Sequence, residues 1–229
     1  MKRKDINKVR IFGRALDGPI KISYNSRGDR LYASRIAITD KNGKETIFTV
    51  HIPQELLEKF VECQKSGKNY EFFGRMVSAF EDNMFKNIVR LKTITNEIDS
   101  SPSLNTASFF FYGSLLKTPM VFSLAKNLYV AKFLLSSHHC YGKETFSAFY
   151  EMQSDEAPKF LQERKHIICS GDFKNITPHG VQADKENFLK PQITNLISPK
   201  LVSNEQFDLI KNFDTSTQVL EDLSKLSKE

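Results

Sequence analysis

The sequence predicts an all-β protein with short helices, built from two copies of one small domain of about 100 residues. The main observation is a repeat, in which Gly43-Lys44-Glu45-Thr46 returns as Gly142-Lys143-Glu144-Thr145. A period this long is unlike that of a solenoid and fits a duplicated domain. Four further anchors return in the same order: Gly13 and Gly113, Pro19 and Pro119, Leu31-Tyr32 and Leu128-Tyr129, and Gly74 and Gly171.

The first copy consists of short stretches that alternate in hydropathy, which predicts half-buried strands. Asn42-Gly43 is a hairpin signal, because both residues readily take the positive φ angles of a tight turn. After Pro53 the period changes, and apolar residues then recur on one helical face until Gly67. The strands are predicted at 8–14, 31–39, 45–52, 70–77 and 87–95, with the helix between the third and the fourth, and Gly18-Pro19 breaks the chain after the first.

The second copy repeats this order of elements. A short helix is predicted to open at Ser154, with that residue as its N-cap and with Asp155 and Glu156 in its first turn. The strands are predicted at 107–115, 128–136, 144–152, 167–173 and 187–196, the last of them interrupted by Pro191.

Five short strands with one helix between the third and the fourth is the element order of the OB-fold. This small, partly open barrel binds oligonucleotides or oligosaccharides on its strands and adjoining loops. The sequence therefore predicts two tandem OB-fold barrels, at residues 1–100 and 101–200, followed by an acidic helical or flexible tail at residues 201–229.

Two stretches of the first copy resemble bacterial and phage single-stranded DNA-binding proteins. They are Asn7-Lys8-Val9-Arg10-Ile11-Phe12-Gly13-Arg14 followed by Gly18-Pro19, and Tyr70-Glu71-Phe72-Phe73-Gly74-Arg75. The similarity covers roughly residues 5–98 and, more faintly, 105–196. It implies binding of single-stranded DNA, with little sequence preference, in replication, recombination or repair.

The sequence departs from that family in two respects. Members usually stack bases on tryptophan, and this chain has none. They also usually end in a flexible acidic tail with an apolar tip, whereas the residues from Leu220 to Glu229 have the pattern of a mildly acidic amphipathic helix. Docking of partners through the tail is therefore not carried over to this chain.

Charge is distributed unevenly along the chain. The net charge of +6 divides into +6 for residues 1–100, +3 for residues 101–200 and −3 for residues 201–229. Eight of the nine arginines lie in the first hundred residues, and arginine offers a planar fork for phosphates and stacks on rings. The first copy is therefore the expected nucleic-acid-binding domain, and the phenylalanine-rich second copy is the expected scaffold or assembly surface.

Binding a single strand requires cations for phosphates and flat rings for bases. The family resemblance makes Tyr32, Phe48 and Phe85 the rings best suited to replace tryptophan, although phenylalanine more often lies in a core. The predicted nucleic-acid-binding residues are Arg10, Phe12, Arg14, Arg27, Arg30, Tyr32, Arg35, Phe48, Arg75, Phe85, Lys86 and Arg90. In the second copy the rings that could stack are Phe111, Tyr129, Phe146, Phe149 and Tyr150, with Lys126, Lys132, Lys143 and Lys174 near phosphates.

The sequence contains no motif of a known catalytic site. It has no phosphate-binding glycine-rich loop, no H-E-x-x-H and no nucleophile elbow, and its carboxylates are scattered. No apolar run is long enough for a membrane span, and no signal-peptide stretch follows the basic N-terminus. Cys63, Cys140 and Cys169 have no C-x-x-C spacing, which favours reduced thiols in a cytoplasmic protein. We therefore expect neither an enzyme nor a cofactor.

Three alternatives remain at the level of sequence. The residues His138-His139-Cys140 and His166-x-x-Cys169 are of the types that bind zinc. However, adjacent histidines on a strand point to opposite faces, and the two groups lie on predicted strands that are not neighbours, so no metal site is predicted. The protein could instead be an accessory of a replisome or primosome whose barrels grip protein partners, or it could bind RNA. A homo-oligomer is possible in each case.

Overall fold

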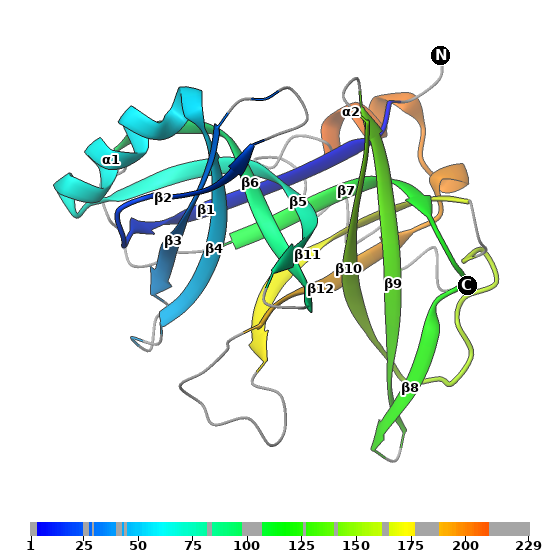
Figure 1. Ribbon diagram of the computed structural model, residues 1–229. Helices are drawn as coiled ribbons and strands as arrows, with labels where there is room; N and C mark the ends of the chain where they lie inside the picture. Colours follow the sequence, from blue (N-terminus) through cyan, green and yellow to red (C-terminus); the bar gives the residue numbers. More distant parts are fainter. Residues whose placement is uncertain are drawn as a thin grey trace. The chain divides into compact units, whose positions relative to one another are not determined.

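The structure is a computed structural model that describes residues 4–24, 28, 30–39, 43, 45–81, 84–97, 107–125, 127–139, 142–161, 165–176 and 188–210. The chain divides into two compact units (Figure 1). The first barrel comprises Lys8–Ser108 with Phe173–Leu189, and the second comprises Phe109–Asp172 and Lys190–Glu229 with the N-terminal residues up to Asn7. Each is described by itself below.

The first barrel is a closed circle of five strands with a sixth at its edge. Within it, β1 pairs with β3 and β5, β3 with β4, and β6 with both β4 and β5. All of these pairs are antiparallel except β4 with β6, and β2 lies outside the circle beside β3. The strands are β1 (Ile6–Ala15), β2 (Ile20–Tyr24), β3 (Arg30–Thr39), β4 (Glu45–Pro53), β5 (Asn69–Glu81) and β6 (Met84–Glu97).

The second barrel follows the same path. Here β7 pairs with β9 and β11, β9 with β10, and β12 with both β10 and β11, while β8 forms the edge beside β9 (Figure 1). This is the strand order of the OB-fold, so the predicted fold class is confirmed. The strands are β7 (Ala107–Leu115), β8 (Met120–Ala125), β9 (Leu128–His139), β10 (Gly142–Met152), β11 (His166–Ile176) and β12 (Phe188–Ile197).

The edge strands β2 and β8 are not among the strands that the sequence predicts. Each follows a proline, Pro19 or Pro119, and proline in a sequence favours a break. Proline lacks a backbone donor but can precede or begin an edge strand without loss of a ladder hydrogen bond. Strand β12 is predicted in spite of Pro191, and it runs through that residue.

The helices differ from the predictions in two places. The first barrel has a 3-10 turn at Gln54–Leu56 followed by α1 (Leu57–Ser66), which ends at Gly67 with a φ of 65°. The helix predicted to open at Ser154 is wrong, since residues 153–156 form bends. The hydroxyl of Ser154 accepts a hydrogen bond from the Glu156 N–H at 3.1 Å, so the residue closes a local turn instead of capping a helix.

The second barrel ends in a short helix, α2 (Asn204–Ile210), which follows a 3-10 turn at Pro199–Leu201. Ser203 and Gln206 form a capping box at its start, with N–H to side-chain oxygen distances of 2.9 and 3.1 Å. The helix belongs to a buried cluster, against which Ile6 also packs, made of Phe110, Tyr112, Ile168, Ile197, Val202, Phe207 and Ile210. The predicted amphipathic stretch from Leu220 to Glu229 lies outside the described residues.

Four of the repeated glycines have no room for a side chain. A Cβ added to Gly74 would lie 2.6 Å from the carbonyl oxygen of Arg90, and one added to Gly113 would lie 2.6 Å from that of Ser136. Gly13 and Gly171 would meet the carbonyl oxygens of Ala37 and Gln192 even more closely. The repeat therefore marks points where neighbouring strands of each barrel approach too closely for any residue but glycine.

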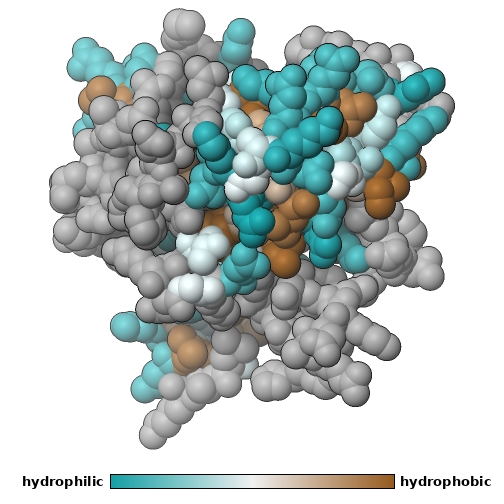
Figure 2. Space-filling model, turned by 90° about the vertical axis from the view of Figure 1, so that its left-hand side faces the viewer, coloured by the Kyte–Doolittle hydropathy of each residue, from teal (hydrophilic) through white to brown (hydrophobic). Residues whose placement is uncertain are grey.

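None of the helices described here is long and apolar enough to cross a membrane. Among the residues that Figure 2 colours on one face of the molecule, hydrophilic side chains predominate and hydrophobic ones form small separate patches. Such scattered apolar surface is usual for a folded protein.

Candidate nucleic-acid interface

The outer face of β1 carries a cation stacked on rings, as predicted. Val9 and Ile11 are buried, whereas Arg10, Phe12 and Arg14 alternate with them on the other face. The guanidinium carbon of Arg10 lies 4.4 Å from the centroid of the Phe12 ring, a cation–π distance. This strand therefore brings positive charge and a flat ring onto one face.

Three of the predicted arginines form ion pairs with acidic residues. Arg10 forms an ion pair with Glu71, and Arg35 forms one with Asp17. Arg14 Nη2 lies 3.4 Å from Glu45 Oε1. The acids come from positions distant in the sequence, so the pairs could not be foreseen from the chain alone. Three of the eight arginines in the first hundred residues are consequently paired with acids at close range.

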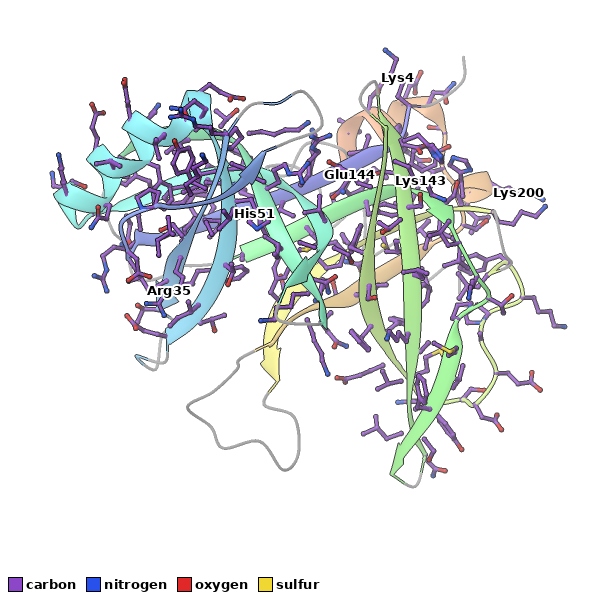
Figure 3. All side chains as sticks on the ribbon, viewed as in Figure 1. Lys4, Arg35, His51, Lys143, Glu144 and Lys200 are labelled. Atoms are coloured by element: carbon purple, nitrogen blue, oxygen red, sulfur yellow. The ribbon has the colours of Figure 1, made fainter. Side chains whose placement is uncertain are left out.

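The ion pair of Arg35 and Asp17 is about half exposed to solvent, and Figure 3 labels Arg35 on the first barrel. The hydrogen bond from Arg35 is the main cause that lowers the pKa of Asp17, and burial opposes it. The same hydrogen bond raises the pKa of Arg35. Both partners are therefore charged at neutral pH.

A row of basic side chains crosses three neighbouring strands of the first barrel. Arg90 on β6 is the register partner of His51 on β4 and of Arg75 on β5. Register partners share a face of a sheet, so the three side chains stand side by side. His51 is only 4% exposed, and the Nε atoms of both arginines are buried. Among these three, Arg75 and Arg90 are like charges on directly paired positions of neighbouring strands.

The remaining predicted residues of the first barrel are less informative. The Tyr32 hydroxyl donates a hydrogen bond to Gln54 Oε1 at 2.9 Å. Arg30 is exposed and Lys86 is half-buried. Arg27 and the side chain of Phe85 lie outside what the structure describes.

Phe48 corrects one of the predictions. Its side chain is fully buried, and its ring meets that of Phe173 edge-on with centroids 5.3 Å apart. A ring enclosed in this way has no face to offer a base, so the expectation that Phe48 is a stacking platform is wrong. The strand pattern placed an apolar residue correctly, but β4 turns that residue inward.

Of the rings suggested for the second barrel, some are buried in the core and others are half-buried. Phe111 and Phe146 are buried and meet edge-on at 5.2 Å, so they belong to the core. Tyr129, Phe149 and Tyr150 are half-buried. Lys126 and the side chain of Lys174 lie outside the described residues. Lys143 is exposed and the adjacent Glu144 is buried, on opposite sides of β10 (Figure 3).

Sequence reasoning missed Lys190 on β12. Its Nζ lies 5.1 Å from the centroid of the Phe149 ring. Burial, and secondarily the nearby Lys132, lower the pKa of Lys190. No sequence signal pointed to this residue, because strand 187–196 was the most irregular of the predicted strands.

The histidines considered for zinc meet at a carboxylate. Asp5 Oδ1 lies 3.2 Å from His166 Nε2, and Asp5 Oδ2 lies 3.4 Å from His138 Nδ1. Asp5 also accepts a hydrogen bond from the His138 N–H at 2.8 Å. Cys169 is buried, and in the part of the chain that the structure describes, no group of three or more His, Cys, Asp or Glu residues could hold a metal ion. The side chain of His139, and Cys140, lie outside that part.

Comparisons with solved structures identify similar folds. The wild-type single-stranded DNA binding protein from Thermus aquaticus matches 86% of this chain and 94% of its own, with a TM-score of 0.61 and 16% sequence identity. A deletion mutant of that protein, which also carries a point substitution, matches 86% of this chain and 95% of its own, with a TM-score of 0.58 and 16% identity. No protein-family model and no curated protein sequence matches. The chain thus shares the fold of these proteins over both barrels.

Proposed function

We propose that this protein binds single-stranded DNA, largely independently of sequence, in replication, recombination or repair. The observation that carries the proposal is the likeness in fold to a single-stranded DNA binding protein over 86% of the chain. Arg75 and Arg90 add support, since they gather positive charge on one face of two neighbouring strands. Cations would capture the phosphate backbone, and exposed rings would stack on bases.

Titration of labelled oligo-dT at several salt concentrations tests the proposal. Affinity is expected to fall linearly with salt on logarithmic axes, with a slope of about −0.7 for each phosphate contact. Absence of binding, or an affinity independent of salt, would contradict it. A parallel titration with oligo-U separates DNA from RNA, because a 2′-hydroxyl that is read or rejected makes the two affinities differ.

A second candidate function is a protein-interaction accessory of a replisome or primosome. The edge strand β2 favours it, because Ile20 and Ile22 are 70% and 42% exposed there. An exposed apolar edge invites pairing with another chain. Co-purification of a partner that is lost in Ile20→Ser plus Ile22→Ser, together with no measurable affinity for oligonucleotides, would select this function. Neither candidate requires a catalytic group, and we propose a binding protein, not an enzyme.

A further inference from the structure

One face of the second barrel gathers a half-buried ring, two lysines and apolar side chains. The strand register brings Met120 on β8, Lys132 on β9, Phe149 on β10 and Gln192 on β12 into one row. Directly paired residues share a face. Lys190 precedes Gln192 by two residues and so lies on that face as well. The ring contact between Lys190 and Phe149 agrees with this arrangement.

The face is accessible along its free edge. Strand β8 is the outermost strand of the second barrel (Figure 1). Met120 is 55% exposed and Phe122 is 48% exposed. Lys132, Phe149 and Lys190 are each half-buried. The edge of this face along β8 is therefore exposed to solvent.

The two lysines have no acidic partner among the described residues, unlike three arginines of the first barrel. Within the described ranges, neither Lys132 nor Lys190 forms an ion pair with an acidic residue, whereas Arg10, Arg14 and Arg35 each do. Glu151, two residues from Phe149, is an acid on the same face, and it stands opposite Val130. Lys132 and Lys190 instead repel each other, which contributes to the lowered pKa of Lys190. A phosphate placed between them would exchange this repulsion for attraction.

We infer that Lys132, Phe149 and Lys190 form a nucleic-acid subsite on the second barrel, which takes a phosphate between the lysines and a base on the phenyl ring. The inference rests on the proposed function, and it gives the second barrel a direct part in binding where the sequence predicted a scaffold. Its basis is a ring held beside two cations that no described acid neutralises.

The absence of tryptophan from the chain permits a direct test of the ring. Phe149→Trp introduces a single fluorophore at the proposed subsite. Tyr150→Trp is the matched control, because Tyr150 is the next residue on β10, points to the other face and packs against buried Phe133. Addition of oligo-dT is expected to quench the fluorescence of the Phe149→Trp protein and to leave that of the Tyr150→Trp protein nearly unchanged. Equal responses of the two proteins would overturn the inference.

Charge and stacking are tested separately by affinity. Lys132→Gln plus Lys190→Gln should make the salt slope less steep by about 1.4, since two phosphate contacts are lost. Lys159→Gln plus Lys200→Gln removes the same charge from exposed positions of the second barrel that are not on the row, and it should leave the slope near that of the wild type. Phe149→Leu keeps an apolar side chain, and it should weaken binding of oligo-dT roughly 5- to 150-fold.

The outcomes distinguish the inference from the function on which it rests. If the wild-type protein does not bind oligo-dT, the proposed function fails and the subsite fails with it. If the wild type binds with a steep salt slope but the lysine pair matches its control and Phe149→Leu binds normally, only the subsite is refuted. Circular dichroism and thermal unfolding establish that each variant is folded. A loss of binding can then be attributed to the substituted side chains and not to unfolding.

Discussion

A side chain on Gly171 of β11 would overlap the backbone carbonyl oxygen of Gln192 on β12. In the first barrel Gly74 stands in the same relationship to Arg90, with 2.6 Å between an added Cβ and the carbonyl oxygen. The two glycines are one of the pairs in the sequence repeat. Their spacing therefore reflects the same close approach of strands in two barrels.

Gly171→Ala is expected to destabilise the protein by about 3 kcal/mol or more, because backbone atoms must move to admit the methyl group. Gly18→Ala is the control, since no atom lies within 4 Å of its added Cβ. Thermal unfolding followed by circular dichroism should show a lower midpoint, by about 6–12 °C, for Gly171→Ala alone. A small shift that is equal in both variants would contradict the role assigned to the repeat.

Phe48→Ala should reduce stability far more than Phe12→Ala. The buried ring of Phe48 leaves a cavity when it is removed, at a cost of about 3–5 kcal/mol. Phe12 is half-buried beneath Arg10, so its loss should cost about 1 kcal/mol. Urea denaturation measures both. If Phe12→Ala proves the more destabilising, the assignment of Phe48 to the core is wrong.

Asp17→Asn should strengthen binding of single-stranded DNA, because it frees Arg35 from its ion pair. The gain is expected to be about 1.5- to 5-fold, the equivalent of an exposed ion pair. Glu62→Gln on α1 makes the same change in net charge at an exposed site, and serves as the control in the same titration. An identical gain in both variants would show only a general effect of charge.

The pair of Asp17 and Arg35 also predicts a dependence of stability on pH. The pKa of Asp17 is lowered in the folded protein, so the pair stabilises the fold at pH values above the ordinary value of 3.8. That contribution is lost as the pH falls below 3.8 through the lower folded pKa. Both side chains are about half exposed, so it should stay below about 1 kcal/mol. Urea titrations of wild type and Asp17→Asn should differ at about pH 7, and the difference should shrink as the pH falls below 3.8.

The thiols of Cys63 and Cys169 should resist alkylation in the folded protein. Burial raises the pKa of Cys63 to about 11 and raises that of Cys169 further, and the thiolate is the reactive form. Treatment with iodoacetamide at about pH 8, followed by peptide mass mapping, should leave both unmodified until urea is added. Rapid modification without urea would show that these side chains are exposed.

The elements of the fold were largely readable from the sequence, because alternating hydropathy is a local property of each strand. The buried and exposed positions of β1 follow that alternation residue by residue. Edge strands such as β2 are harder to predict, because few of their residues are buried and Pro19 resembles a chain break. At Ser154 the sequence predicts a helix that the structure lacks. The same side-chain hydroxyl can close a turn or cap a helix, and here it closes a turn.

The candidate site was less predictable. The sequence correctly placed Arg10, Phe12 and Arg14 on one face, but it showed neither that acids hold those arginines nor that Phe48 is enclosed. Lys190 and Phe149 are 41 positions apart in the sequence, and only the pairing of β10 with β12 brings them together. No pattern within a single strand contains that information.

By itself the sequence determined the duplicated barrel, since strand periodicity is a local property of the chain and the repeated glycines mark the same close approaches of strands in both copies. Tertiary structure alone decided which charges are neutralised and which rings are accessible. Those properties depend on distances between strands that are remote in the chain, and the Coulomb energy and burial that govern binding follow those distances. For this reason the sequence points to the arginine-rich first copy as the binding domain, whereas the folded chain also places two lysines and a ring on one face of the second.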